Sequence, residues 1–155
     1  MKILLFLHLS ICAFCQSKKD IRENRVKSLT EVITSAEKNV TYKDNYQKFD
    51  KNGNVLEEIS YDDTGKIKGK TVIKYNKEND KVEESTFDSN GKLVERQTFK
   101  YNEDGEKQEE LSYNGKGELM TKAVYQYNSK GLKKDKKTWD AKGKLLQTKV
   151  YQYEF

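Results

Sequence analysis

An aromatic residue returns along this chain at regular intervals, which alternate between 12 and 14 positions. The anchors are Phe49, Tyr61, Tyr75, Phe87, Tyr101, Tyr113, Tyr127, Trp139 and Tyr153. Asp or Asn follows nearly every anchor, and Gly usually stands four residues after it, as in Phe49-Asp50-Lys51-Asn52-Gly53. A fixed period of this kind is the signature of a repeat array. The repeating unit is 26 residues long.

Each turn has the pattern Asp/Asn-x-x-Gly. The short polar side chain caps the amides of its own turn, and Gly accepts positive φ without a Cβ penalty. We therefore expect tight hairpins, with left-handed glycines at Gly53, Gly65, Gly91, Gly105, Gly117, Gly131 and Gly143. Asn79 ends the third turn in place of Gly, and Asn tolerates the left-handed conformation better than most residues.

The segments between turns alternate between eight and ten residues, which matches strands joined by short loops. The sequence predicts an all-β protein, an antiparallel meander of about nine to ten strands built from tandem β-hairpins in a single twisted or curled sheet. Two outcomes stay open: closure toward a barrel, or an open sheet with one face largely wet.

Three parts of the chain are distinguished: residues 1–15 as a cleaved signal peptide, residues 16–40 as a lead segment, and residues 41–155 as the repeat domain. Residues 16–24 are polar, and we expect them to be loose. Residues 25–34 suit a helix by the spacing of Val26, Leu29 and Ile33, or a strand by their β-branched content. We favour a strand that forms a hairpin with the next one through residues 35–39.

The N-terminal residues have the pattern of an export signal. Lys2 precedes an apolar run over residues 3–14, and the small residues before Gln16 suit cleavage there. Lipid attachment at a cysteine is less favoured, because bulky residues precede both cysteines. We expect an exported protein, located in the periplasm, at the surface or outside the cell.

Cleavage before Gln16 removes both cysteines, Cys12 and Cys15, and the sole histidine, His8. The mature chain then lacks the groups needed for a thiol nucleophile, a Cys/His zinc site, a Ser-His-Asp triad or a disulfide. The acidic and basic residues alternate along the chain, which is typical of a solvated surface rather than of a nucleic-acid patch.

The longer strands place their aromatic residues on one side. Large apolar and aromatic residues recur at three positions of the longer strands that share one parity. They are Ile67, Leu93, Leu119 and Leu145 near the start, Ile73, Phe99, Tyr125 and Tyr151 further along, and Tyr75, Tyr101, Tyr127 and Tyr153 at the end. The other parity is mixed, with Val72, Thr98, Val124 and Val150 among lysines and arginine. Counting outward from each turn predicts the ion pairs Glu57–Lys70, Glu83–Arg96 and Glu109–Lys122.

The motif Phe87-Asp88-Ser89-Asn90-Gly91-Lys92-Leu93, repeated at Trp139 to Leu145, resembles the YD repeat of RHS-type bacterial surface and toxin-shell proteins. The resemblance covers Phe49 to Phe155. It implies exported β-hairpin repeats that act as a shell, scaffold or binding surface, with carbohydrate binding suggested for such repeats. A secondary resemblance is to short MORN-like repeat proteins of the YwqK type.

The aromatic row has two interpretations. Its rings can form a platform for sugars, with Tyr125, Tyr127, Tyr151 and Tyr153 as the ligand-facing aromatics, or they can be the buried layer of the sheet. Acidic turns such as Asp62-Asp63 and Glu103-Asp104 suit turn capping better than Ca²⁺ binding. The lysines between Lys130 and Lys144 suit a solvated face or contact with an anionic polysaccharide or lipid.

Catalysis by this chain would need two carboxylates in one pocket. The pairs Glu57-Glu58, Glu83-Glu84 and Glu109-Glu110 are adjacent, so their side chains point to opposite faces of a strand. We therefore expect a protein that is not an enzyme, with no catalytic, cofactor or metal site. The sequence favours an exported binding or scaffold module of the bacterial envelope or exterior, with a carbohydrate-binding module as the alternative. An envelope protein or a polysaccharide suits it as partner, and nucleic acid does not.

Overall fold

The computed structural model describes residues 18–35 and 40–154. A short helix precedes ten strands: α1 (Lys18–Glu23), β1 (Ser28–Ser35), β2 (Val40–Phe49), β3 (Val55–Tyr61), β4 (Ile67–Tyr75), β5 (Lys81–Asp88), β6 (Leu93–Tyr101), β7 (Lys107–Asn114), β8 (Leu119–Tyr127), β9 (Lys133–Asp140) and β10 (Leu145–Val150). The predicted signal peptide and residues 36–39, part of the predicted hairpin connection, lie outside the described residues.

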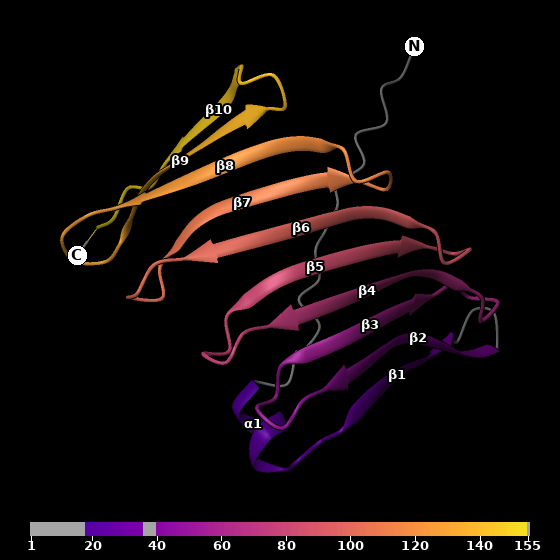
Figure 1. Cartoon of the computed structure of the whole chain (residues 1–155). Coiled ribbons are helices and arrows are strands. Elements are labelled where there is room, and N and C mark those ends of the chain that lie inside the picture. Colours follow the sequence, from indigo (N-terminus) through magenta and orange to yellow (C-terminus); the bar gives the residue numbers. More distant parts are fainter. Residues whose placement is uncertain (1–17, 36–39, 155) are drawn as a thin grey trace.

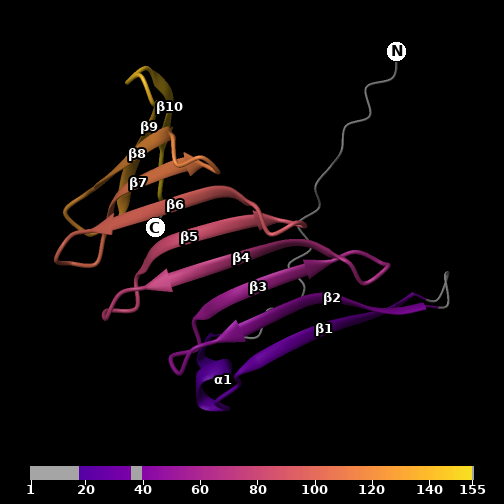
Figure 2. The same cartoon turned by 45° about the vertical axis from the view of Figure 1, so that its right-hand side comes forward.

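All ten strands form one antiparallel sheet in sequence order. Each strand pairs with the one before it, so the predicted meander is confirmed (Figure 1). The sheet is open, with β1 and β10 as its two edges. Figure 2 shows how its strands rotate progressively from β1 to β10, the right-handed twist that antiparallel strands adopt.

The turns follow the Asp/Asn-x-x-Gly pattern closely. The Gly91 amide donates to the Asp88 carbonyl at 3.0 Å, and the Asp88 carboxylate accepts from the Asn90 and Lys92 amides at 2.9 and 3.0 Å. The seven glycines of the turns have φ between 72° and 82°, and Asn79 has a φ of 68°. The turn chemistry therefore fixes where each strand ends.

Residues 28–35 form a strand, so the choice between helix and strand is settled in favour of the strand, and β1 pairs with β2 as a hairpin. The expectation that residues 16–24 are loose is wrong for α1. Its Ile21 side chain is only 3% exposed, and Gly53 of the β2–β3 turn lies against the backbone of Lys18. The Phe49 amide donates to the Lys27 carbonyl at 2.9 Å. Tertiary contact therefore orders this short helix at one corner of the sheet.

The two faces of the sheet are defined by the register, because directly opposed residues lie on one side. The Tyr125 face carries Tyr125 opposite Lys136 and Phe99 opposite Glu110. The Trp139 face carries Trp139 opposite Lys122.

In the described part of the chain, no helix has the length and hydrophobicity needed to cross a bilayer.

The expectation that only one face is rich in aromatic residues is wrong, because the Trp139 face also carries a row of rings. The rings after the shorter strands form a second row there, because Phe87, Tyr113 and Trp139 stand directly opposite Lys70, Arg96 and Lys122. The Arg96 guanidinium lies over the Tyr113 ring at 4.6 Å. Each face therefore has its own aromatic row.

The core of this sheet is thin. Among the described residues, the buried apolar side chains are Ile21, Phe49, Phe99 and Ala123. Many other strand positions are half-buried, and lysine or arginine side chains lie over several of the rings, as Lys81 and Lys107 do over Phe99. Stability therefore depends on strand pairing and on pairs of side chains across neighbouring strands.

Candidate functional site

The Tyr125 face places three rings in a row across its C-terminal half: Phe99 on β6, Tyr125 on β8, and Tyr151 just after β10. These positions are 26 residues apart, so consecutive rings are separated by two strand spacings, about 9.5 Å. Phe99 is only 5% exposed, while Tyr125 and Tyr151 are half-buried. The row thus becomes more open toward the β10 edge.

A lysine stands at the same place in three successive units, at Lys81, Lys107 and Lys133, and the last two lie between the rings. Lys107 has its ammonium 4.3 Å from the centroid of the Phe99 ring and 5.6 Å from that of Tyr125. Lys133 repeats this arrangement one unit later, at 5.5 Å from Tyr125 and 5.9 Å from Tyr151. A cation over a ring face is attracted by the ring quadrupole. We call these rings and lysines, together with Lys136 and Lys149, the ring–lysine row.

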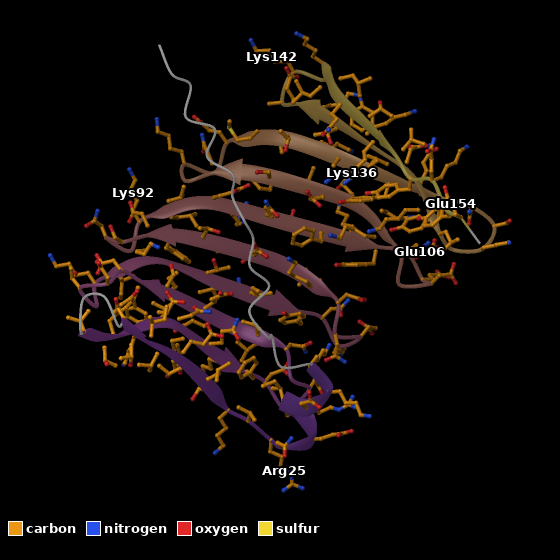
Figure 3. All side chains as sticks on the ribbon, turned by 180° about the vertical axis from the view of Figure 1, so that it is seen from behind. Arg25, Lys92, Glu106, Lys136, Lys142 and Glu154 are labelled. Atoms are coloured by element: carbon orange, nitrogen blue, oxygen red, sulfur yellow. The ribbon has the colours of Figure 1, made fainter. Side chains whose placement is uncertain are left out.

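Glu110 is the acidic centre of the ring–lysine row. Its carboxylate accepts from the Tyr125 hydroxyl at 2.8 Å and from the Lys136 ammonium at 3.2 Å, and Lys107 lies 3.7 Å away. Burial raises the pKa of Glu110, but the hydrogen bonds from Tyr125 and Lys136 outweigh burial and hold the pKa below its ordinary value. Burial lowers the pKa of Lys107. Opposite charges therefore cluster beside the rings. Of these residues, Lys136 is labelled in Figure 3.

The tyrosines at the ends of the longer strands have another role. The Tyr101, Tyr127 and Tyr153 hydroxyls donate to the carbonyls of Lys81, Lys107 and Lys133, each at 2.9 Å. These carbonyls lie at strand starts, beyond the last paired residues of β5–β6, β7–β8 and β9–β10. The hydroxyl supplies a partner that the strand ladder does not.

The four tyrosines singled out from the sequence therefore divide into two classes. Tyr125 and Tyr151 lie in the ring–lysine row, whereas Tyr127 and Tyr153 use their hydroxyls on the backbone. Tyr153 is nevertheless 43% exposed. The sequence interpretation missed the lysines of the row, although the recurrence of Lys81, Lys107 and Lys133 at the period of the repeat was a signal for them.

The adjacent glutamates diverge, as strand geometry requires. Glu109 forms ion pairs with Lys122 at 2.7 Å and Lys100 at 3.0 Å on the Trp139 face, while Glu110 lies on the Tyr125 face. Asp62 caps its turn, accepting from the Thr64 hydroxyl at 2.6 Å and from two backbone amides. Within the described ranges, no group of three or more His, Cys, Asp or Glu is arranged to hold a metal ion.

No family model matches the chain, and neither does a curated protein. Among solved structures, TarM of S. aureus is 21% identical with a TM-score of 0.33, over 83% of this chain and 22% of TarM. A Bacteroides fragilis protein of unknown function is 12% identical with a TM-score of 0.44, over 83% of this chain and 96% of that one. This chain thus spans about a fifth of TarM.

The expectation that this protein is not an enzyme is corrected by the comparison, because its structural neighbours include TarM, a glycosyltransferase. The similarity is too weak to assign an activity. A weaker neighbour is the TcdB2–TccC3–Cdc42 complex, which contains an RHS/YD-repeat toxin. It is 13% identical with a TM-score of 0.28, over 81% of this chain and 9% of that one.

Proposed function

We propose that this protein is an exported binding module of the RHS-repeat type and that the ring–lysine row is its ligand-binding surface. The observation that supports it is the recurrence of ring and lysine at a two-strand spacing along one face. A row that repeats in one direction suits a ligand that repeats in one direction. The ligand class that fits is a linear polysaccharide.

The exposure of the row supports the same proposal. Phe99 is buried at the inner end, where it anchors the row, and the Tyr125 and Tyr151 side chains remain partly accessible. Aromatic side chains that combine an apolar ring with a polar tip are well suited to contacts with sugars, which expose both C–H and hydroxyl groups. Glu110 and Lys136 stand beside them as acceptor and donor for hydroxyls.

Native electrophoresis of the purified protein through gels that contain dextran, xylan, polygalacturonate or dextran sulfate tests the proposal. We expect retardation by at least one polymer. The double variant Tyr125→Ala/Tyr151→Ala should lose about tenfold in affinity, which corresponds to the loss of two ring contacts. The matched control, Tyr61→Ala/Tyr113→Ala, removes two rings outside the ring–lysine row and should keep its affinity.

Absence of retardation by all four polymers, in a protein that unfolds cooperatively, would refute the proposal. An equal loss in both double variants would also refute it, because the loss would then reflect the general stability of the sheet.

A scaffold function through the β10 edge is the second candidate. All six residues of β10 are exposed, and Leu145, Leu146 and Val150 are 50–64% exposed. An unpaired strand edge with apolar side chains can accept another strand. Analytical ultracentrifugation tests this candidate: a self-association that Thr148→Pro removes would support it, because Pro cannot extend the ladder.

A further inference from the structure

We infer that the polymer bound by the ring–lysine row is a linear anionic polysaccharide, whose acidic groups are held by Lys133, Lys136 and Lys149 beside Tyr151. This inference rests on the proposed function, since it names the ligand class of the same surface. Five observations support it: the charge distribution, a pair of opposed lysines, the scarcity of acidic partners, the coverage of the rings, and the geometry of the row.

The positive charge of the chain is concentrated in one hairpin. Residues 130–149 contain eight Lys, two Asp and no Glu or Arg, while the whole chain has a formal charge of +5. The rest of the chain is therefore close to neutral, and nearly the entire charge excess lies around β9 and β10. A local excess of this kind attracts polyanions over distances of about a Debye length.

The lysines at the centre of this hairpin oppose each other. Lys136 and Lys149 are direct partners in the β9–β10 register, and directly opposed like charges destabilise a sheet. Other charged pairs in direct register combine opposite charges, as in Lys74–Glu83 and Lys100–Glu109. In the preceding units an acid, Glu84 or Glu110, occupies the position of Lys136. Glu110 supplies a carboxylate to Lys136, and a bound anion would supply one to the neighbouring Lys149.

Acidic partners are scarce around these lysines. Lys136 pairs with Glu110 at 3.2 Å, but within the described residues no carboxylate forms an ion pair with the Lys133 or Lys149 ammonium. Both ammonium groups lie instead over rings, Lys133 over Tyr125 and Tyr151 and Lys149 over Tyr151 at 5.5 Å. Two cations held beside one partly accessible ring form an anion-binding position.

The positions of the lysines also argue against a neutral polysaccharide as the ligand. Lys107, Lys133 and Lys136 all have their ammonium groups over the Tyr125 ring, within 5.0–5.6 Å of its centroid. A neutral sugar that stacked on this ring would have to displace them. An anionic chain leaves the cation–ring contacts in place and adds its own ion pairs.

The shape of the row favours a polysaccharide over the other polyanions. Equivalent lysines are two strand spacings apart, about 9.5 Å, which is about the length of two sugar residues in an extended chain. Single-stranded nucleic acid is bound through bases stacked on open ring faces, and here lysines cover the rings. A membrane surface requires a broad basic patch, whereas the equivalent lysines Lys107 and Lys133 alternate with rings along one row.

Isothermal titration of the purified protein with dextran and dextran sulfate tests the inference, because the two polymers share a backbone and differ in charge. Polygalacturonate supplies carboxylates in place of sulfates. We expect binding of at least one of the two acidic polymers, at least about tenfold tighter than that of dextran and weakening with added NaCl. The emission of Trp139 should change little, since Trp139 lies on the other face.

The variant Lys133→Gln/Lys149→Gln should lose about tenfold in affinity for the acidic polymer at low salt, since two charges near the ligand disappear. The matched control Lys66→Gln/Lys92→Gln makes the same change in net charge outside residues 130–149. Lys92 lies at the opposite end of the strands from Glu106 (Figure 3). It should lose less than about twofold.

Equal affinity for dextran and dextran sulfate, lost in Tyr125→Ala/Tyr151→Ala, would overturn the anionic ligand and leave the binding function intact. An equal loss in both lysine variants would overturn the assigned position. If single-stranded oligothymidine or phosphatidylglycerol vesicles bind more tightly than the acidic polysaccharides, the ligand is a nucleic acid or a membrane surface, and the inference is wrong. Absence of binding to any of these polymers would refute the proposed function itself.

Discussion

The Lys70 ammonium lies 2.7 Å from the Glu57 carboxylate, although the residue directly opposite Glu57 is Val72. The contact is diagonal. The same arrangement returns at Lys122 and Glu109, again at 2.7 Å. The sequence named the ion-pair partners correctly and their register wrongly, so the long lysine side chain, rather than direct opposition, brings the charges together.

A double-mutant cycle on Glu57→Gln and Lys70→Gln should give a coupling energy of about 0.2–1 kcal/mol, because the pair is half-exposed. Urea unfolding of the four proteins measures it. The control is a second cycle, on Glu58→Gln and Lys70→Gln. The Glu58 side chain lies on the Tyr125 face beside Asn45. A coupling between Glu58 and Lys70 as large as that of Glu57 would contradict the diagonal pair.

Tyr101→Phe and Tyr127→Phe should each destabilise the protein by about 0.5–1.5 kcal/mol, because each leaves a backbone carbonyl without its hydroxyl donor. Thermal unfolding followed by circular dichroism measures the effect. In the described structure the Tyr151 hydroxyl has no such bond, so Tyr151→Phe serves as the matched control with a change near zero. Equal effects at the three positions would show that the hydroxyl contact is unimportant.

Gly115→Ala should destabilise the sheet by about 1–3 kcal/mol, because a Cβ at this position would collide with the Leu93 carbonyl oxygen. The equivalent position of the last turn is Ala141, which already has a Cβ. Ala141→Ser should therefore change the free energy of unfolding by no more than about 0.5 kcal/mol. A neutral Gly115→Ala would mean that β6 and the β7–β8 turn can move apart at no cost.

Acid should destabilise the protein through Glu109. Hydrogen bonds from Lys122 and Lys100 hold the pKa of Glu109 below its ordinary value of 4.5. The unfolded state then binds more protons than the folded state, so the stabilisation is complete above the ordinary pKa and is lost as the pH falls through the folded pKa. The midpoint of thermal unfolding should fall over that range, and less steeply in Glu109→Gln. Parallel profiles would contradict this assignment.

Expression in a bacterial host with an export pathway should yield a mature chain that begins at Gln16. Intact-mass spectrometry of the secreted or periplasmic protein checks this, and a chain without both cysteines gives no signal with thiol reagents. A product with lipid at Cys12 or Cys15 would contradict cleavage before Gln16 and would show that the protein is a lipoprotein.

The sequence defined the turns and the meander because both depend on local chemistry. Each Asp/Asn-x-x-Gly group fixes one reversal, and the parity of Phe99, Tyr125 and Tyr151 follows from strand alternation. The register was harder to predict. Asp62 pairs through its amide with the Lys66 carbonyl, and a further shift follows at Tyr61, so a symmetrical count outward from the turn fails.

Neither the helix α1 nor the ring–lysine row could be predicted from the sequence, for different reasons. Six residues with Ile21 as their one buried side chain are too few to show helical periodicity, and a helix of this length needs tertiary contacts to form. The contact of Lys107 with Phe99 depends on which side the Lys107 side chain takes next to a register shift. Only the folded backbone decides that.

The two aromatic rows also limit how such a chain changes its length in evolution. Removing a single strand with its turn would reverse the direction of everything after it, and would move each later ring to the other side of the sheet and the other end of its strand. Removing a strand pair with both of its turns, which is one whole repeating unit, keeps both rows in line. Duplication and loss are therefore tolerated in whole units, and a natural series of homologues should differ in length by multiples of this step.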